Sequence, residues 1–315
     1  MRPSWKLSYV AAACVLAIAG CSGDGGSGTP EAADTTTAAT RTTASTATTG
    51  TAAAGEAADI TVDKTGWFGG FEITVDKATA TPTGSTTDVE LELSYKNLVG
   101  VKAPPPEEAY LDVQGSVIDV KFEEQTVAGF GEASGTATAS VKASGSKADP
   151  EQLLDSAALV YGETDSNQTK IPFAEDGKVE TIEPRGIPVG QTMGIGTAVT
   201  FQLTRAFLWP SYQPGEKGKY ELWIEYNAEC LDCPGVLSYA MHRDDFTLTA
   251  PDGKSVPADY RSPAGDKSVS SGYNVEGQWL VFLIDAPATG AYTLKITFVG
   301  TNRELKVEDT TTITL

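Results

Sequence analysis

The chain has 315 residues, with 42 acidic against 23 basic side chains, and its formal net charge is −19 at pH 7. So acidic a protein repels phosphate backbones and anionic headgroups, which argues against nucleic-acid binding. Short runs of alternating apolar and polar residues, separated by Gly, Pro, Asp and Asn, are typical of an all-β protein.

The first twenty residues have the parts of an export signal. Arg2 and Lys6 supply positive charge, and the apolar stretch Leu7–Gly20 is shorter than the roughly 20 residues that a membrane-spanning helix needs. The stretch runs into Ile18-Ala19-Gly20-Cys21, which resembles the bacterial lipobox, where the Cys is acylated and the chain is cut before it. The resemblance implies a signal peptide over residues 1–20, palmitate or a similar acyl chain on Cys21, and a lipid anchor at the extracytoplasmic face of the cell membrane. An ordinary secretory signal is the alternative.

Residues 21–58 are rich in Thr, Ala, Gly and Ser and contain almost no large apolar side chain. Such a segment cannot bury enough surface to offset its chain entropy, so we expect a disordered tether. Its clustered threonines are candidate sites for O-linked sugar.

An internal repeat follows the tether. Three pairs of strand-like runs match in order: Phe71–Ala78 with Val199–Ala206, Val89–Tyr95 with Tyr220–Tyr226, and Thr136–Val141 with Trp279–Ile284. We therefore predict two tandem β-sandwich domains, residues 59–183 and 187–315, joined by a short Pro- and Gly-containing connector. A short helix is expected only at Pro150–Ser156.

One side of each strand should be buried in these sandwiches. The expected core residues of the first are Phe71, Ile73, Val75, Val89, Leu91, Leu93 and Tyr95. Those of the second are Phe201, Leu203, Leu222, Ile224, Tyr226, Leu280, Phe282 and Ile284.

The opening strand F-E-I-T-V-D-K-A, the strand D-V-E-L-E-L-S-Y-K-N and the Ala/Thr-rich stalk resemble those of lipoproteins from high-GC Gram-positive bacteria, the actinobacteria. That resemblance implies tandem immunoglobulin-like domains and an extracytoplasmic address. It implies no catalytic residue and no cofactor.

Two cysteines remain in the predicted body, Cys230 and Cys233. Outside the cytoplasm, the expected state of such a pair is a disulfide, which here would close a very small loop after a strand. A redox pair and a zinc site that includes His242 are the alternatives, and both lack the surroundings that they need.

No catalytic constellation or metal site is recognisable. His242 is the only histidine, no Gly-x-Ser-x-Gly elbow accompanies it, and we expect a surface position or a simple hydrogen bond. The oxygen-rich run Glu163–Asn167 lacks the Gly and the closing Glu of a calcium loop, so a hairpin turn is the better interpretation.

The two repeats differ on their outward faces. Where the first has polar residues, the second has bulky apolar ones, and we interpret Trp209, Tyr212, Trp223 and Trp279 as a possible partner surface. There are two alternatives. These residues pack against the first domain, or a β-bulge shifts the strand register so that they belong to the hydrophobic core. The sequence thus predicts a non-enzymatic binding module for an envelope protein or glycan, with a structural envelope lipoprotein as second choice and an enzyme as third.

Overall fold

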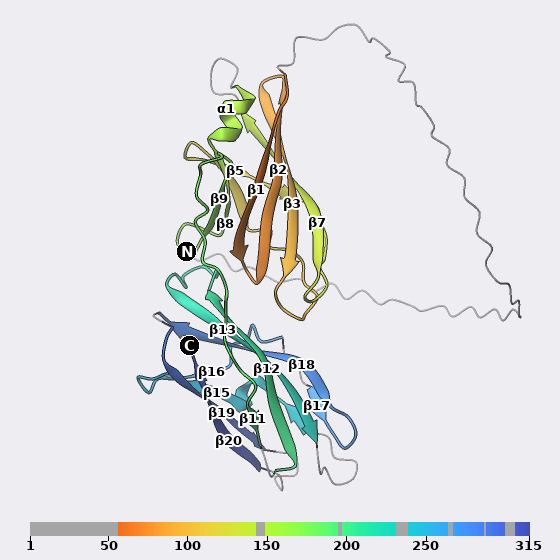
Figure 1. Cartoon of the computed structure of the whole chain (residues 1–315), viewed down its shortest axis with the longest axis vertical. Coiled ribbons are helices and arrows are strands. Elements are labelled where there is room, and N and C mark those ends of the chain that lie inside the picture. Colours follow the sequence, from red (N-terminus) through yellow and green to blue (C-terminus); the bar gives the residue numbers. More distant parts are fainter. Residues whose placement is uncertain are drawn as a thin grey trace, which may run out of the picture. The chain divides into compact units, whose positions relative to one another are not determined.

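The computed structural model describes residues 56–142, 149–194, 197–230, 239–263, 267–286, 288–299 and 306–315. Strands are the main regular structure of these residues and helices are short (Figure 1), which confirms the all-β prediction. The predicted signal peptide, Cys21 and nearly all of the predicted tether lie outside the described residues. The short predicted helix is confirmed: Asp149 caps the N-terminus of α1 (Pro150–Asp155), and its side chain accepts a hydrogen bond from the N–H of Glu151.

Two antiparallel sheets enclose the first hydrophobic core, and we call this part the first sandwich. One sheet has the strand order β1 (Ala58–Phe68), β2 (Phe71–Thr83), β3 (Thr86–Asn97), β7 (Glu132–Lys142) and β6 (Lys121–Phe122). The other has the order β5 (Ser116–Asp119), β4 (Ala109–Val113), β8 (Ala157–Tyr161) and β9 (Thr169–Pro172).

The second sandwich encloses a second core. Its first sheet has the order β10 (Arg185–Gly186), β12 (Val199–Pro210), β13 (Lys219–Cys230) and β18 (Val275–Asp285), and β11 (Thr192–Met193) also pairs with β12. Its second sheet has the order β16 (Ser255–Pro257), β15 (Phe246–Thr249), β19 (Ala291–Val299) and β20 (Lys306–Thr314). The strands β14 (Tyr239–Met241) and β17 (Lys267–Val269) form a separate pair, and the 3-10 helix η1 (Arg243–Asp245) precedes β15.

Strand periodicity places the core as predicted. Along β3, buried and exposed residues alternate, so that Leu91 is 1% exposed while its neighbours Glu90 and Glu92 face solvent. All fifteen core residues expected from the sequence are buried, and this part of the prediction is confirmed.

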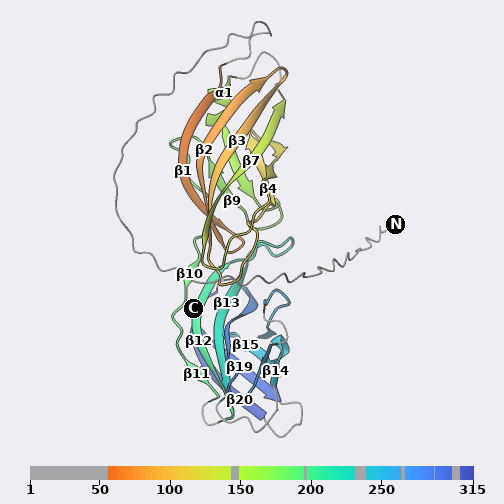
Figure 2. The same ribbon diagram turned by 90° about the vertical axis from the view of Figure 1, so that its right-hand side faces the viewer.

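The internal repeat includes a β-bulge at the same position in both copies. The strand order β2–β3–β7, seen side by side in Figure 2, recurs as β12–β13–β18. The register shifts between Val75 and Lys77 in β2, and between Leu203 and Arg205 in β12, so each strand has one bulged residue at the same place in the repeat. Beyond the bulge, Lys77 pairs with Glu92 and Arg205 pairs with Glu225.

This pairing corrects the predicted alignment of the second strand. Glu92 corresponds to Glu225, so the run Tyr220–Tyr226 matches residues 87–93 rather than Val89–Tyr95. The error is two residues, and because strand side chains alternate with a period of two, it left every residue on the correct face.

The connector between the sandwiches is only partly a linker. Arg185 pairs with Leu208 in the short strand β10, and Ile187 is buried in the second core. Residues 51–315 form one compact unit. Independent folding of residues 59–183 and 187–315 therefore stays a prediction.

Candidate functional site

The aromatic residues predicted to form a partner surface are not an exposed patch. Trp209 is 2% exposed and Trp279 1%, Tyr212 is also buried, and Trp223 is half-buried. Trp209, Tyr212 and Trp279 therefore form no exposed patch, whereas a partner contact that uses the half-exposed Trp223 stays a prediction.

Packing against the first sandwich explains their burial. Trp209 and Tyr212 belong to the first hydrophobic core, although Trp209 lies in β12 of the second sandwich and Tyr212 follows that strand. The ring of Tyr212 lies 4.2 Å from that of Phe68, centroid to centroid, and its hydroxyl donates a hydrogen bond of 2.9 Å to the carbonyl of Trp67. The alternative that these residues pack against the first sandwich is confirmed.

Trp279 is covered by loops of the first sandwich. Its ring lies 6.3 Å from that of Phe130, over which the guanidinium of Arg205 sits at 4.2 Å. A Cβ at Gly100 would come within 2.9 Å of Phe130 and 3.3 Å of the Trp279 indole nitrogen, so this close approach requires glycine. The Trp279 indole N–H has no hydrogen-bond partner among the described residues.

A buried carboxylate lies beside these rings. Glu221, 7% exposed, accepts hydrogen bonds from the indole nitrogens of Trp223 at 2.8 Å and Trp209 at 3.3 Å. The guanidinium of Arg261 donates to it at 2.8 Å. Charged and indole donors together offset the cost of burying Glu221.

Arg261 joins two further carboxylates to this network. It donates to Glu216 at 2.8 Å and to Asp259 at 2.7 Å. Burial opposes ionisation of Asp259, but hydrogen bonds and charge from Arg261 outweigh burial and lower the Asp259 pKa. Burial likewise opposes the charge on Arg261, yet the carboxylates around it raise its pKa. No sequence signal links Arg261 to Glu221, because they lie 40 residues apart and Arg261 is in a loop.

The structure assigns no chemical role to the cysteines, to His242 or to the oxygen-rich run that the sequence singles out. Cys230 ends β13 and is buried, whereas Cys233 lies outside the described residues, so their pairing stays a prediction. His242 is exposed ahead of η1, as expected of a surface residue. The run Glu163–Asn167 is the turn of the hairpin between β8 and β9, also as expected. Within the described ranges, no three His, Cys, Asp or Glu side chains are grouped to hold a metal.

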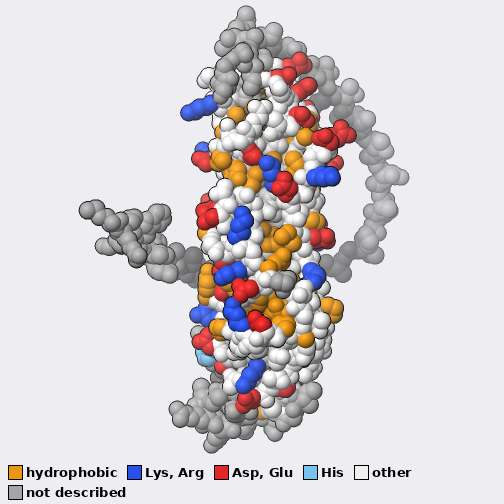
Figure 3. All heavy atoms as spheres, turned by 90° about the vertical axis from the view of Figure 1, so that its left-hand side faces the viewer, with side chains coloured by type: hydrophobic (Ala, Val, Ile, Leu, Met, Phe, Trp, Pro, Cys, Tyr) orange, Lys and Arg blue, Asp and Glu red, His pale blue; other side chains and the backbone are white. Residues whose placement is uncertain are grey.

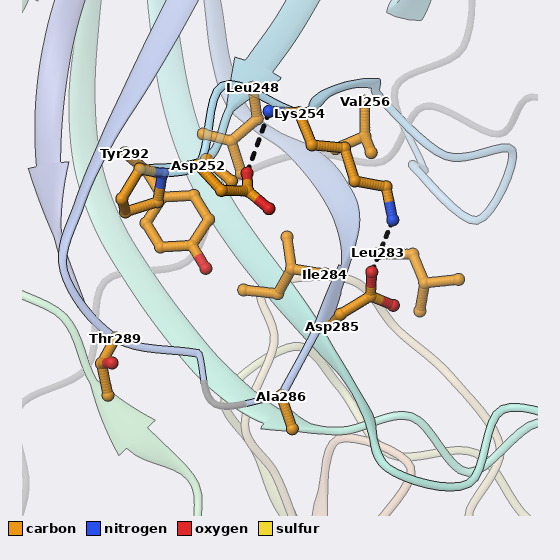
Figure 4. Close-up of a pocket in the computed structure, with 12 residues that line it drawn as sticks. Leu248, Asp252, Lys254, Val256, Leu283, Ile284, Asp285, Ala286, Thr289 and Tyr292 are labelled. Carbon is orange, nitrogen blue, oxygen red and sulfur yellow. Dashed lines mark hydrogen bonds and ion pairs between the residues drawn. The ribbon is translucent and has the colours of Figure 1, made fainter.

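A cavity of about 300 Å³ opens at one end of the second sandwich. It lies between the hairpin that joins β15 to β16 and the end of β18 (Figure 4). Its wall is mainly apolar and is made by Leu248, Ala250, Pro251, Val256, Leu283, Ile284, Ala286 and the ring of Tyr292. Ligand pockets have volumes of about 300–1,000 Å³ and apolar walls with a few polar groups, so this cavity is a candidate binding site.

The hydroxyl of Tyr292 points into this space, which we call the Tyr292 cavity (Figure 4). Tyr292 is 4% exposed as a whole residue, but its hydroxyl is not among the fully buried polar atoms without a partner, so it meets the open space of the cavity. Burial, followed by the charges of Asp252 and Asp285, raises the Tyr292 pKa. The hydroxyl is therefore protonated at neutral pH and able both to donate and to accept a hydrogen bond.

Charged groups stand around the mouth. Lys254 forms an ion pair with Asp285 that bridges the two sheets, and the pairing raises the pKa of Lys254 and lowers that of Asp285. Both side chains are 59% exposed, so this surface pair adds little stability. The carboxylate of Asp252 accepts a hydrogen bond of 2.9 Å from the backbone N–H of Lys254.

A second hollow, of about 450 Å³, shares Lys254, Val256, Leu283 and Asp285 with the Tyr292 cavity. Its other walls are more polar and include Arg243, Asp259 and the exposed ring of Tyr260. The ion pair of Lys254 and Asp285 thus stands where the two hollows meet.

The turn at the cavity has a sequence signal, but the cavity itself has none. Pro251-Asp252-Gly253 is a recognisable turn sequence, and Gly253 has φ +89°. Nothing near Tyr292 in the sequence indicates that its hydroxyl would face that turn.

Neither a protein-family model nor a curated protein matches this sequence. The resemblance to actinobacterial lipoproteins therefore stays a prediction. Among the residues described, no helix is long and apolar enough to cross a membrane.

Proposed function

We propose that the protein is a lipid-anchored, extracytoplasmic binding protein, that it is not an enzyme, and that its ligand site is the Tyr292 cavity. The observation that carries the proposal is the Tyr292 hydroxyl, which a nearly buried ring directs into an apolar cavity. A ligand in this cavity could hydrogen-bond to the hydroxyl while its apolar part covers the wall, and the few polar groups of an apolar pocket usually orient the ligand in this way.

The chemistry around the cavity favours binding over catalysis. Tyr292 keeps its proton at neutral pH because its pKa is raised, so it is a poor general base. Asp285 is held by Lys254, and neither histidine nor cysteine is among the residues that line the cavity. General acid–base or nucleophilic catalysis would need a group activated near neutral pH.

Charges of both signs are mixed on one face of the molecule. On the face shown in Figure 3, Lys and Arg side chains lie among Asp and Glu side chains and small apolar areas. This face therefore presents no wide field of a single sign.

Cys21 supplies the anchor in this proposal, and residues 22–58 supply a tether with a coil span of roughly 30–37 Å. Replacement of Cys21 by Ala should move the protein from the membrane fraction to the soluble fraction, and intact mass should show loss of the acyl chains. Continued membrane association of Cys21→Ala would contradict the anchor without affecting the cavity.

Ligand-observed NMR against a library of small metabolites and saccharides tests the binding site. We expect ligands that bind the wild-type protein to be lost in Ala286→Trp, which fills the cavity, and kept in Ser85→Trp, which adds the same side chain to an exposed turn of the first sandwich. Ligands that bind all three proteins equally would contradict the site.

A structural envelope lipoprotein without a discrete ligand is the second candidate. The burial of Trp209 and Trp279 between the sandwiches favours it, because side chains that hold the body together are not available to a partner. Under this alternative, Ala286→Trp would leave every cellular phenotype of the wild type unchanged.

A further inference from the structure

The polar groups of the Tyr292 cavity are mainly hydrogen-bond acceptors. The Tyr292 hydroxyl and the Asp252 carboxylate both face the space beside Ile284, as Figure 4 shows. Asp252 forms no ion pair among the residues that the structure describes, since its recorded hydrogen bond comes from a neutral backbone N–H. One carboxylate at the mouth is thus not neutralised.

The positive charge at this mouth is already used. Lys254 is the only basic side chain in the cavity wall; its ammonium is bound to Asp285, on which the charge of Lys219 in the adjoining hollow also acts. The three charged groups of the wall therefore sum to one negative charge. Removal of residues 1–20 would take away two basic residues and no acidic one, which leaves the whole chain at −21.

The inner wall has the opposite character. Leu248, Ile284 and the Tyr292 ring are nearly buried and form an apolar lining. An apolar group of a ligand that covered this lining would remove apolar surface from water, which is favourable. A ligand that fits has an apolar body for this wall and a hydrogen-bond-donating, positively charged head for the mouth.

We propose that the Tyr292 cavity binds a small organic cation with an apolar body, such as an alkylammonium or arylalkylammonium compound. This inference rests on the proposed function and names the ligand class of the same site. The head donates hydrogen bonds to Asp252 and to the Tyr292 hydroxyl, while the body covers Ile284 and Leu248.

Calorimetric titration of the full chain carrying Cys21→Ser, which removes the acylation site and leaves all described residues unchanged, tests the inference. The probes are hexylammonium, hexan-1-ol and hexanoate, which share one apolar body and differ in the charge of the head. Because hydrogen bonds to a charged group are stronger than neutral ones, hexylammonium should bind roughly tenfold or more tightly than hexan-1-ol. Hexanoate should bind most weakly, and added salt should weaken the binding of hexylammonium.

Two variants locate the recognition. Asp252→Asn keeps an acceptor for the Lys254 N–H but removes the charge, so the preference for hexylammonium over hexan-1-ol should fall roughly tenfold. Tyr292→Phe keeps the ring and should weaken all probes that donate a hydrogen bond. Asp119→Asn, at an exposed carboxylate of the first sandwich, is the matched control and should change nothing.

The outcomes separate this inference from the proposed function. If hexan-1-ol or hexanoate binds as tightly as hexylammonium, and this binding is lost in Ala286→Trp, the preference for a cation is overturned while the binding site stands. An unchanged preference in Asp252→Asn would also overturn the inference. Failure of all three probes to bind would overturn it as well, while the library experiment would still decide whether the cavity binds another ligand.

Discussion

The hydroxyl of Tyr212 donates a hydrogen bond to the backbone carbonyl of Trp67, a residue 145 positions earlier in the chain. Nearby, the side-chain amide of Asn167 donates to the carbonyl of Ser211 at 2.6 Å. The loop after β12 thus completes the core of the first sandwich and is hydrogen-bonded to it. The first core therefore contains residues from both sandwiches.

This shared core predicts a large effect of truncating Trp209. Trp209→Ala should lower the free energy of unfolding by about 3–5 kcal/mol, because it empties a buried site in the first core. Guanidinium unfolding followed by circular dichroism measures it, with Tyr273→Ala as the control, since Tyr273 is 67% exposed.

A chain that ends at residue 183 should bind a hydrophobic dye and unfold without a sharp transition, because it lacks Trp209 and Tyr212. A cooperative transition in that chain would show that the first sandwich does not need Trp209.

Arg261 should be essential to stability through charge. Arg261→Met leaves Glu216, Glu221 and Asp259 without their shared cation, and loss of one partner of a buried ion pair typically costs about 3–5 kcal/mol. Thermal unfolding at low and high salt measures the effect. Arg243→Met, in which an exposed and longer ion pair with Asp244 is lost, should stay within about 0.5 kcal/mol of the wild type. Equal effects of the two replacements would contradict the role of the network.

Stability should fall in alkali because buried tyrosines resist ionisation. Burial raises the pKa of Tyr95 from 10.0 to about 12. A raised pKa in the folded state means that the contribution to stability is complete below pH 10 and is lost as the pH rises from 10 to about 12. Circular dichroism at 25 °C across this range should show alkaline unfolding, and Tyr95→Phe should move its midpoint to higher pH. Tyr273→Phe, at an exposed ring, should not move it.

The cysteine pair should be oxidised and contribute little to stability. Denatured, unreduced protein carrying Cys14→Ser and Cys21→Ser should expose no reactive thiol, and reduction should expose two, from Cys230 and Cys233. Because the loop is so short, loss of the bond should lower the unfolding free energy by about 2 kcal/mol or less. Two reactive thiols before reduction would rule out the disulfide.

Alternation along the strands predicted much of this fold. In β3 and β13, a period of two placed Leu91 and Ile224 in the cores, and this survived an alignment error of two residues. The same alternation assigned Trp223 and Trp279 to the outward face of their sheet. What covers that face cannot be read from one strand, because the covering residues, such as Phe130, come from a distant part of the sequence.

The Tyr292 cavity could not be predicted from the sequence for the same reason. Asp252, Asp285 and Tyr292 come from a turn, a strand end and another strand, and each looks like an ordinary residue of its own element. Their convergence depends on how two sheets meet at their edges. Local propensity contains no information on that meeting, whereas the Pro251-Asp252-Gly253 turn could be recognised because its chemistry is local.

The position of Trp209 and Tyr212 late in the chain has a consequence for biogenesis. A polypeptide that crosses a membrane from its N-terminus delivers the strands of the first sandwich well before the two rings that fill the end of its core. If the chain is exported in this direction, Phe68 and its neighbours should stay uncovered until the β12–β13 hairpin has emerged. We would then expect the core of the N-terminal half to be completed only when the C-terminal half arrives.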